Sequence, residues 1–193
     1  ESVEKCSNEE ERNHFLHLMS EETVHMKRLI DDMLLLANSD ADTLTIKPEA
    51  CQPDLLLLDT YEKFEPLAKK NGLHLILTLP EEILPDCFCD IHRTEQIFSI
   101  IVDNALCYTP SGGKVTLSCH AENEMLCFLF KDTGCGISEE KKSHIFERFY
   151  RADDAHTDRE HFGLGLCIAK ELTEKQNGNI QVVDAPISGS CFM

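Results

Sequence analysis

Four short segments of this 193-residue chain carry side chains that could bind a nucleotide. In chain order they are Asn104 within a helical pattern, Asp132-Thr133-Gly134-Cys135-Gly136, the segment from Phe146 to Arg151, and Gly163-Leu164-Gly165-Leu166. An amide oxygen can bind Mg²⁺, a carboxylate can read the edge of a base, and a basic segment and a glycine turn can bind phosphates. Together the segments predict one ATP pocket, built without a P-loop.

Asp132 and the two glycines after it favour recognition of adenine. A carboxylate accepts a hydrogen bond from the exocyclic amine of adenine, whereas guanine presents an acceptor oxygen at that edge. Gly134 and Gly136 would let the backbone approach the ring closely. Because an isolated Asp-x-Gly is more often an ordinary turn, this prediction depends on the other three segments.

Gly163-Leu164-Gly165 opens a predicted helix, whose free N–H groups could bind phosphate oxygens. The segment is not a dinucleotide fingerprint, because Ile168 follows Gly165 where a third glycine would stand and no strand runs directly into the turn. A polar stretch without hydrophobic period separates Phe149 from Phe162. Arg151, at its start, is the residue that we expect to reach the phosphates.

The elements that would position these residues alternate between helix and strand. Two predicted strands are separated by four residues, which suits an antiparallel hairpin. Asn177-Gly178 would end the last predicted helix as a left-handed cap. The predicted strands cover residues 73–79, 114–120, 125–131, 180–184 and 190–193, and the predicted helices cover residues 94–108, 138–146 and 164–176.

A long helix is predicted from about Glu10 to Asn38, ahead of the mixed region. Its apolar positions follow alternating steps of four and three, which is a heptad seam and favours partner helices. At about 1.5 Å per residue it would be roughly 40 Å long. A terminal helix folded onto its own domain is the alternative. The polar run from Asn38 to Asp42 is the expected boundary. The seam consists of Phe15, Met19, Met26, Leu29, Met33 and Leu36, with Glu22 at the remaining position.

The composition narrows the possible partners. A net charge of −17 disfavours nucleic acid and anionic membrane surfaces, which are bound through clustered Lys and Arg. No apolar run approaches the roughly 20 residues that a membrane span needs, so we expect a soluble chain. Most of the ten cysteines stand singly in apolar runs and are expected to act as small hydrophobes in a reducing compartment. Cys87-Phe88-Cys89 is the only close pair, which makes a metal site there a weak prediction.

The order of the four segments resembles the catalytic ATP-binding domain of bacterial sensor histidine kinases, within the Bergerat-type ATPase group. Asp103-Asn104-Ala105-Leu106-Cys107-Tyr108-Thr109-Pro110 is similar to the N box of that family, and Phe146-Glu147-Arg148-Phe149-Tyr150-Arg151 to its F box. The resemblance implies an α/β fold, a two-layer sandwich of a mixed β-sheet with helices on one face, preceded by one long heptad-patterned helix. It also implies two domains. Residues 1–42 would be the incomplete second helix of a dimerisation and histidine-phosphotransfer hairpin, and residues 43–193 the ATP-binding domain.

The same resemblance implies ATP and Mg²⁺ as cofactors, transfer of the γ-phosphoryl group to a histidine, and relay to a response regulator. It implies that the intact protein is a homodimer formed through the helical hairpin. It also implies that this chain is the cytoplasmic portion of a membrane-bound sensor kinase. Asn104 would be the metal ligand. The residues implied in ATP binding are Asn104, Tyr108, Asp132, Gly134, Gly136, Arg151, Gly163, Leu164, Gly165 and Ser190.

The chain departs from the family pattern in three respects. Neither His14 nor His17 is followed by an acid and a proline at the family spacing, so the phosphoacceptor helix is expected to lie outside this chain. Ile100 stands where many relatives carry Asn or an acid, and Cys107 where they carry Lys. A thiol cannot replace an ammonium near phosphates, and the alternative for Cys107 is a buried thiol that fills a small apolar gap in the core. Two alternatives therefore stay open, a conformational ATPase of the same fold group and a non-catalytic nucleotide-binding or scaffold module.

Overall fold

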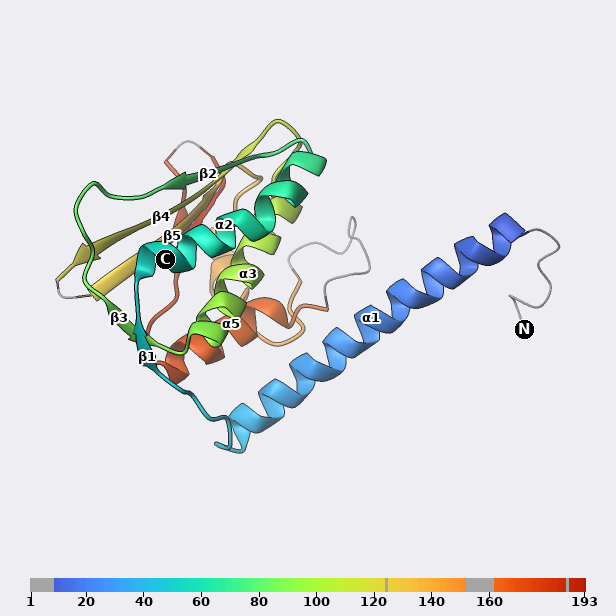
Figure 1. Cartoon of the computed structure of the whole chain (residues 1–193), viewed down its shortest axis with the longest axis horizontal. Coiled ribbons are helices and arrows are strands. Elements are labelled where there is room, and N and C mark those ends of the chain that lie inside the picture. The colour runs from blue at the N-terminus through green and yellow to red at the C-terminus, as the bar shows by residue number, and fades with distance from the viewer. Residues whose placement is uncertain (1–8, 124, 152–161, 187) are drawn as a thin grey trace.

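The computed structural model describes residues 9–123, 125–151, 162–186 and 188–193. A long helix, α1 (Glu9–Asp40), extends away from an α/β domain and contacts it through helix α5 near its C-terminal end (Figure 1). The predicted helix from Glu10 to Asn38 is thereby confirmed, with one or two further residues at each end. None of the described helices is both long enough and apolar enough to cross a lipid bilayer.

The main sheet has five strands in the order β2 (His74–Thr78), β4 (Lys114–Glu122), β5 (Met125–Asp132), β7 (Ser190–Phe192) and β6 (Val182–Asp184). β2 is parallel to β4, and the remaining neighbours are antiparallel. The sheet is therefore mixed, as predicted. β4 alternates between buried and more exposed side chains, because one face lies on the core and the other faces away from it.

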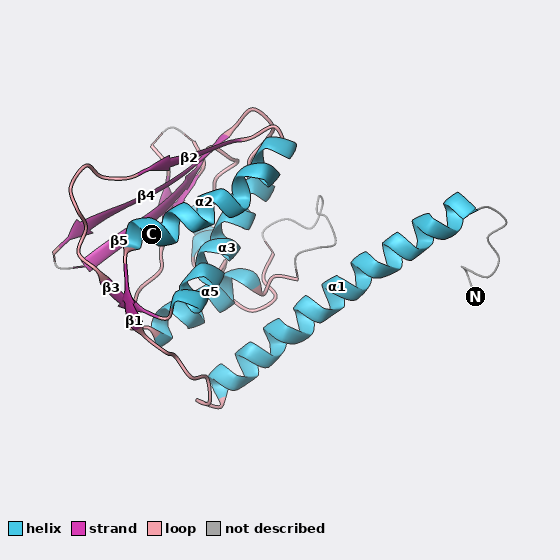
Figure 2. Ribbon diagram, viewed as in Figure 1, coloured by secondary structure: helices cyan, strands magenta, loops and turns pink. Residues whose placement is uncertain are grey.

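Three helices pack on one face of this sheet: α2 (Pro53–Lys70), α3 (Ile91–Tyr108) and α5 (Gly165–Lys175) (Figure 2). The core lies between the two layers. The ring of Phe98 on α3 contacts the rings of Phe128 and Phe130 on β5, with centroids 4.8 and 4.9 Å apart. Side chains with no exposed surface come from both layers and include Leu57, Val102, Val115, Leu117, Ile168 and Leu172. The predicted two-layer sandwich is confirmed.

Three elements were not predicted, namely α2 and the strands β1 (Glu49–Cys51) and β3 (Cys87–Cys89), which pair as a separate antiparallel ribbon. The predicted helix over residues 138–146 is wrong beyond its first turn, because α4 covers Glu139–Lys142 alone. After it, the N–H of His144 bonds to the Lys141 carbonyl and the N–H of Glu147 to the His144 carbonyl. These bonds span three residues instead of four, so the chain continues in turns.

The predicted left-handed end of α5 is confirmed. Asn177 has a φ of +60°. Its N–H bonds to the Glu174 carbonyl, and the N–H of Gly178 bonds to the Thr173 carbonyl at 2.9 Å. The pattern is a Schellman motif with Asn177 in the left-handed position.

The polar run that ends α1 is bound to the α/β domain. Ser39 is buried, and its hydroxyl donates to Glu171 on α5 at 2.7 Å. Arg148 donates to both carboxylate oxygens of Asp40, at 2.6 and 2.8 Å, and Lys175 on α5 pairs with Asp42. These contacts fix the end of α1 on α5. The division into domains at residue 42 stays a prediction.

Most of the heptad seam is exposed. Met19 and Met26 are 57% and 63% exposed, whereas Leu36, in the last turns, is 5% exposed and belongs to the core. Leu29 packs against the core from a half-buried position. The alternative in which the whole helix folds onto its own domain is therefore wrong for the part of the seam before Leu29.

Candidate nucleotide-binding site

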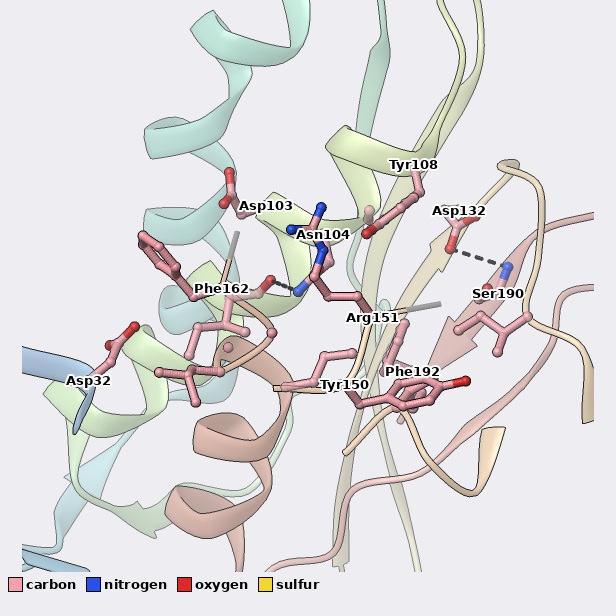
Figure 3. A pocket seen from close by; sticks show the side chains of 18 of the residues that line it. Asp32, Asp103, Asn104, Tyr108, Asp132, Tyr150, Arg151, Phe162, Ser190 and Phe192 are labelled. Atoms are coloured by element: carbon pink, nitrogen blue, oxygen red, sulfur yellow. Dashed lines mark hydrogen bonds between the residues drawn. The ribbon is translucent and has the colours of Figure 1, made fainter. Parts of the chain in front are cut away.

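A cavity of about 940 Å³ lies between the last turns of α3, the start of α5, the end of β5 and the facing side of α1 (Figure 3). Its volume is in the range of small-molecule sites. The four segments singled out in the sequence all reach it. Every residue predicted for ATP binding except Gly134 lines it, namely Asn104, Tyr108, Asp132, Gly136, Arg151, Gly163, Leu164, Gly165 and Ser190.

Asn104 and Tyr108 come from the last turns of α3. The helix is capped by Asp90, whose carboxylate accepts a hydrogen bond from the N–H of Arg93. The side-chain amide of Asn104 donates to the Ile100 carbonyl at 2.8 Å. That bond uses the nitrogen, and Mg²⁺ would need the oxygen, so the donor set fits the ion. Tyr108 is 40% exposed, so its side chain is not part of the core.

Asp132 ends β5 and is 5% exposed. One carboxylate oxygen accepts the N–H of Gly134 at 2.7 Å, and the other accepts the N–H of Ser190 at 3.2 Å. Burial raises the pKa of Asp132 above its ordinary value, and these two backbone bonds oppose that shift. The carboxylate is thus held rigidly at the cavity, and each oxygen has a further lone pair with which it can accept a ligand N–H.

Gly134 does not line the cavity but supports it. A Cβ atom at this position would lie 2.5 Å from the Tyr108 carbonyl oxygen and 2.8 Å from the Asp132 carboxylate. Glycine therefore lets the loop after β5 pass closely beside the end of α3. The close approach seen at Gly134 is to α3, and its approach to an adenine ring stays a prediction.

Gly163 turns the chain into α5. Its φ is +74°, and its carbonyl accepts the N–H of Phe149 at 2.9 Å, which ties the F-box segment to the glycine turn. Leu164 stands at the helix start without a side-chain cap, so the first N–H groups of α5 are the kind of donors that phosphate oxygens bind. Arg151 lines the same cavity. The polar stretch between Phe149 and Phe162 lies largely at residues 152–161, outside the described residues.

One whole wall of the cavity was not predicted from the sequence. Side chains of α1 face the nucleotide segments across it, among them His25, Arg28 and Asp32. No local pattern marks them, because their position follows from the way the end of α1 is fixed on α5. Other lining residues outside the predicted set include Asp103, Ile137, Lys141, Ile145, Tyr150, Phe162 and Phe192.

The two departures from the family pattern occupy different places. Ile100 lines the cavity, one helical turn before Asn104. Cys107 is exposed and is not part of the lining. An exposed position contradicts the alternative in which Cys107 fills an apolar gap in the core.

Comparison with known proteins places this fold and site in a family. The model of the histidine kinase-, DNA gyrase B-, and HSP90-like ATPase family matches residues 89–193, more than half of the chain, and the chain belongs to that family. It is 33% identical over 168 residues to the adaptive-response sensory kinase SasA of Rippkaea orientalis, covering 86% of this chain and 42% of SasA. It is also 33% identical over 181 residues to the sensor protein SrrB of Staphylococcus aureus, covering 92% of this chain and 30% of SrrB. The chain thus spans less than half the length of these relatives.

Two solved structures share the fold. Full-length ShkA in complex with AMPPNP superposes with a TM-score of 0.83 at 24% identity, covering 98% of this chain and 39% of ShkA. Histidine kinase ThkA in complex with the response regulator protein TrrA superposes with a TM-score of 0.76 at 18% identity, covering 99% of this chain and 53% of ThkA. This chain therefore contains the histidine kinase-type ATPase domain of sensor kinases, and both its fold class and its resemblance are confirmed.

Proposed function

We propose that this chain binds ATP with Mg²⁺ in the cavity between α3 and α5 and transfers the γ-phosphoryl group to a histidine on a separate helix. One observation carries the proposal: four segments that are far apart in the sequence meet at one cavity with a carboxylate, an amide, a glycine turn and an arginine in it. Asp132 would accept the adenine amine, Asn104 would hold the metal, and Arg151 with the start of α5 would bind the phosphates.

The transfer itself needs little covalent chemistry from the protein. The bond between the γ-phosphorus and the bridging oxygen breaks, ADP leaves, and a bond forms between phosphorus and an imidazole nitrogen. Positioning and neutralisation of charge supply most of the catalysis. The bound Mg²⁺ would neutralise phosphate charge, and the residues of this chain would orient the nucleotide.

The partners follow from the same proposal. The phosphoryl group would pass from the histidine to an aspartate of a response regulator, and the intact protein would be a homodimer through its helical hairpin. A kinase that uses cellular ATP would work in the cytoplasm. The complex of ThkA with TrrA supports the choice of a response regulator as partner.

Calorimetry on three proteins tests the binding step. The parent should bind ATP and ADP but not GTP, Asp132→Ala should weaken ATP by roughly 10- to 100-fold, and Asn104→Ala should remove most of the effect of Mg²⁺. Asn104→Asp, which keeps an oxygen ligand, is the matched control for the metal. If both alanine variants bind ATP as tightly as the parent, the site is misplaced.

Incubation with γ-labelled ATP tests the transfer. The chain alone should stay unlabelled, and a separately supplied helical hairpin with a phosphoacceptor histidine should gain acid-labile label. Label on His14 or His17 would contradict the proposal. Release of phosphate without label would favour a conformational ATPase. ATP binding with neither label transfer nor phosphate release would favour a non-catalytic module. Two features support that alternative: Ile100 lines the cavity, and position 107 carries Cys where many relatives carry Lys.

A further inference from the structure

Three cysteine sulfurs meet on the small β1–β3 ribbon, away from the nucleotide site. The Sγ atom of Cys51 lies 3.2 Å from that of Cys87 and 3.2 Å from that of Cys89, and the last two are 4.0 Å apart. The ribbon pairing explains the cluster. Cys51 stands directly opposite Cys87, and Cys87 and Cys89 point to the same face because side chains alternate along a strand.

This cluster changes the sequence-based view of the cysteines. The pair Cys87-Phe88-Cys89 indicated only a weak metal site, because no second pair stands at zinc spacing in the sequence. The third sulfur comes from Cys51, 36 residues before Cys87, and only the pairing of β1 with β3 brings it there. All three side chains are half-buried and pack against the core.

The triangle of sulfurs has the size of a metal site. A point in its plane that is equally distant from all three atoms lies about 2.05 Å from each, so an ion at the usual Zn–S distance of about 2.3 Å would sit about 1 Å above that plane. Two of the three S–Zn–S angles would be about 90° and the third about 120°, which lie on either side of the tetrahedral value of about 109°. A fourth position would stay open on the side of the ion away from the sulfurs.

We propose that Cys51, Cys87 and Cys89 form a binding site for one Zn²⁺ ion, with a water molecule as the fourth ligand. Thiolates are soft ligands that select zinc over magnesium or calcium. No fourth His, Cys, Asp or Glu joins the group among the described residues, and three protein ligands with one open position is a known arrangement for zinc.

Zinc binds cysteine as the thiolate, so binding of the ion would displace the protons of the three thiols. Cys89 directly precedes Asp90, the N-cap of α3, and the start of a helix favours negative charge.

The site is separate from the nucleotide site. Cys89 precedes the first turn of α3, and Asn104 lies 15 residues later, roughly 20 Å along the helix. The cluster joins the segment after α1 to the start of α3, where the N–H of Lys47 also bonds to the Asp90 carboxylate at 2.9 Å. A bound ion would cross-link these two segments and stabilise the fold by mass action.

Zinc titration of the reduced, metal-free chain against a chromophoric chelator tests the proposal. The parent should bind one ion with a dissociation constant in the nanomolar range, and zinc in about 100-fold excess over that constant should raise the Tm by about 5–10 °C. Cys89→Ser should weaken zinc by at least about 100-fold. Cys107→Ser, which changes an exposed cysteine outside the cluster, should leave the affinity unchanged.

A second cluster of possible zinc ligands requires its own control variant. His120, Glu122 and Cys127 lie close together on the β4–β5 hairpin. If zinc binding survives the triple change of Cys51, Cys87 and Cys89 to Ser and is lost in His120→Ala, the ion sits on the hairpin and the proposal is wrong.

Alkylation of the parent protein tests the proposal without any substitution in the cluster. Zinc should protect Cys51, Cys87 and Cys89 from iodoacetamide, as seen by mass spectrometry of their peptides, and should leave Cys107 and Cys135 reactive. Equal alkylation of the three cysteines with and without zinc would overturn the proposal.

Discussion

Asp132 is a buried carboxylate whose desolvation opposes its charge. Burial raises its pKa in the folded protein, while the N–H groups of Gly134 and Ser190 hold its oxygens in place. The free domain therefore gives up some stability to keep an acid ready for a ligand amine.

The raised pKa of Asp132 predicts a pH dependence of stability. A group with a raised folded pKa favours the folded state below its unfolded pKa, and this contribution is lost as the pH rises through the folded pKa. The unfolding free energy of the parent, measured relative to Asp132→Asn, should therefore increase as the pH falls from 7 towards 4. Urea denaturation of both proteins over that range measures the difference. A difference independent of pH would mean that the carboxylate is not perturbed.

Cys107 offers a test by gain of affinity. Because its side chain is exposed, Cys107→Lys should leave the Tm nearly unchanged. If the longer side chain reaches the phosphates, ATP should bind more tightly, roughly 10-fold or more, and adenosine should not. Binding isotherms for ATP and adenosine give the ratio of the two affinities. Cys107→Gln, a long side chain without charge, is the control, and an unchanged ratio in the lysine variant would place residue 107 beyond reach of the phosphates.

At the scale of elements, the end of α1 and the F-box segment are joined. Arg148 lies within the segment that resembles the F box, yet it bonds to Asp40 at the end of α1, and Glu171 on α5 lies 4.0 Å away. This pair lowers the pKa of Asp40 through the hydrogen bond from Arg148. A conformational change in the F-box segment would therefore alter the contact that holds the end of α1.

Removal of this contact should loosen α1 without unfolding the domain. Arg148→Ala is expected to change the Tm little, because exposed ion pairs contribute little to global stability. Amide hydrogen exchange in residues 35–42 should become faster, while exchange in β4 and β5 stays the same. Lys69→Ala, which removes an exposed pair with Glu65 inside α2, is the matched control. Equal exchange in parent and Arg148→Ala would show that Ser39 and Asp42 suffice to hold the helix.

At the scale of the whole molecule, α1 presents an apolar stripe before Leu29 that none of the described residues covers. Phe15, Met19 and Met26 are all exposed on it. Contiguous apolar surface of this kind marks a contact with another helix. The proposed homodimer would cover it.

The exposed seam predicts self-association of this chain. The parent should show a concentration-dependent increase in mass by light scattering, and Met19→Glu combined with Met26→Glu should shift it to monomer. Ile83→Ser is the control, since Ile83 is fully exposed but lies far from the seam in the sequence. A monomeric parent at all concentrations would mean that the stripe does not associate with copies of this chain.

The sequence by itself determined those helices, strands and turns whose signals are local. Period-two and heptad patterns identified α1 and the main strands, and an Asn-Gly pair identified the end of α5, because these signals lie within one turn or one strand. The type and order of the four nucleotide segments predicted residues that line one cavity, with the exception of Gly134. Tyr108, Asp132 and Gly163 were each predicted from the chemistry or the resemblance of their own segment.

The tertiary structure alone decided which distant residues meet. α2 has helical apolar spacing but was not predicted, and α4 stops early because the chain after it must turn to bring Phe149 to Gly163. The α1 wall of the cavity depends on Ser39, Asp40 and Asp42 binding to partners more than 100 residues away. The three-cysteine cluster depends on a strand pair that joins residues 51 and 87. Such contacts follow from packing and long-range pairing, and no local sequence pattern records them.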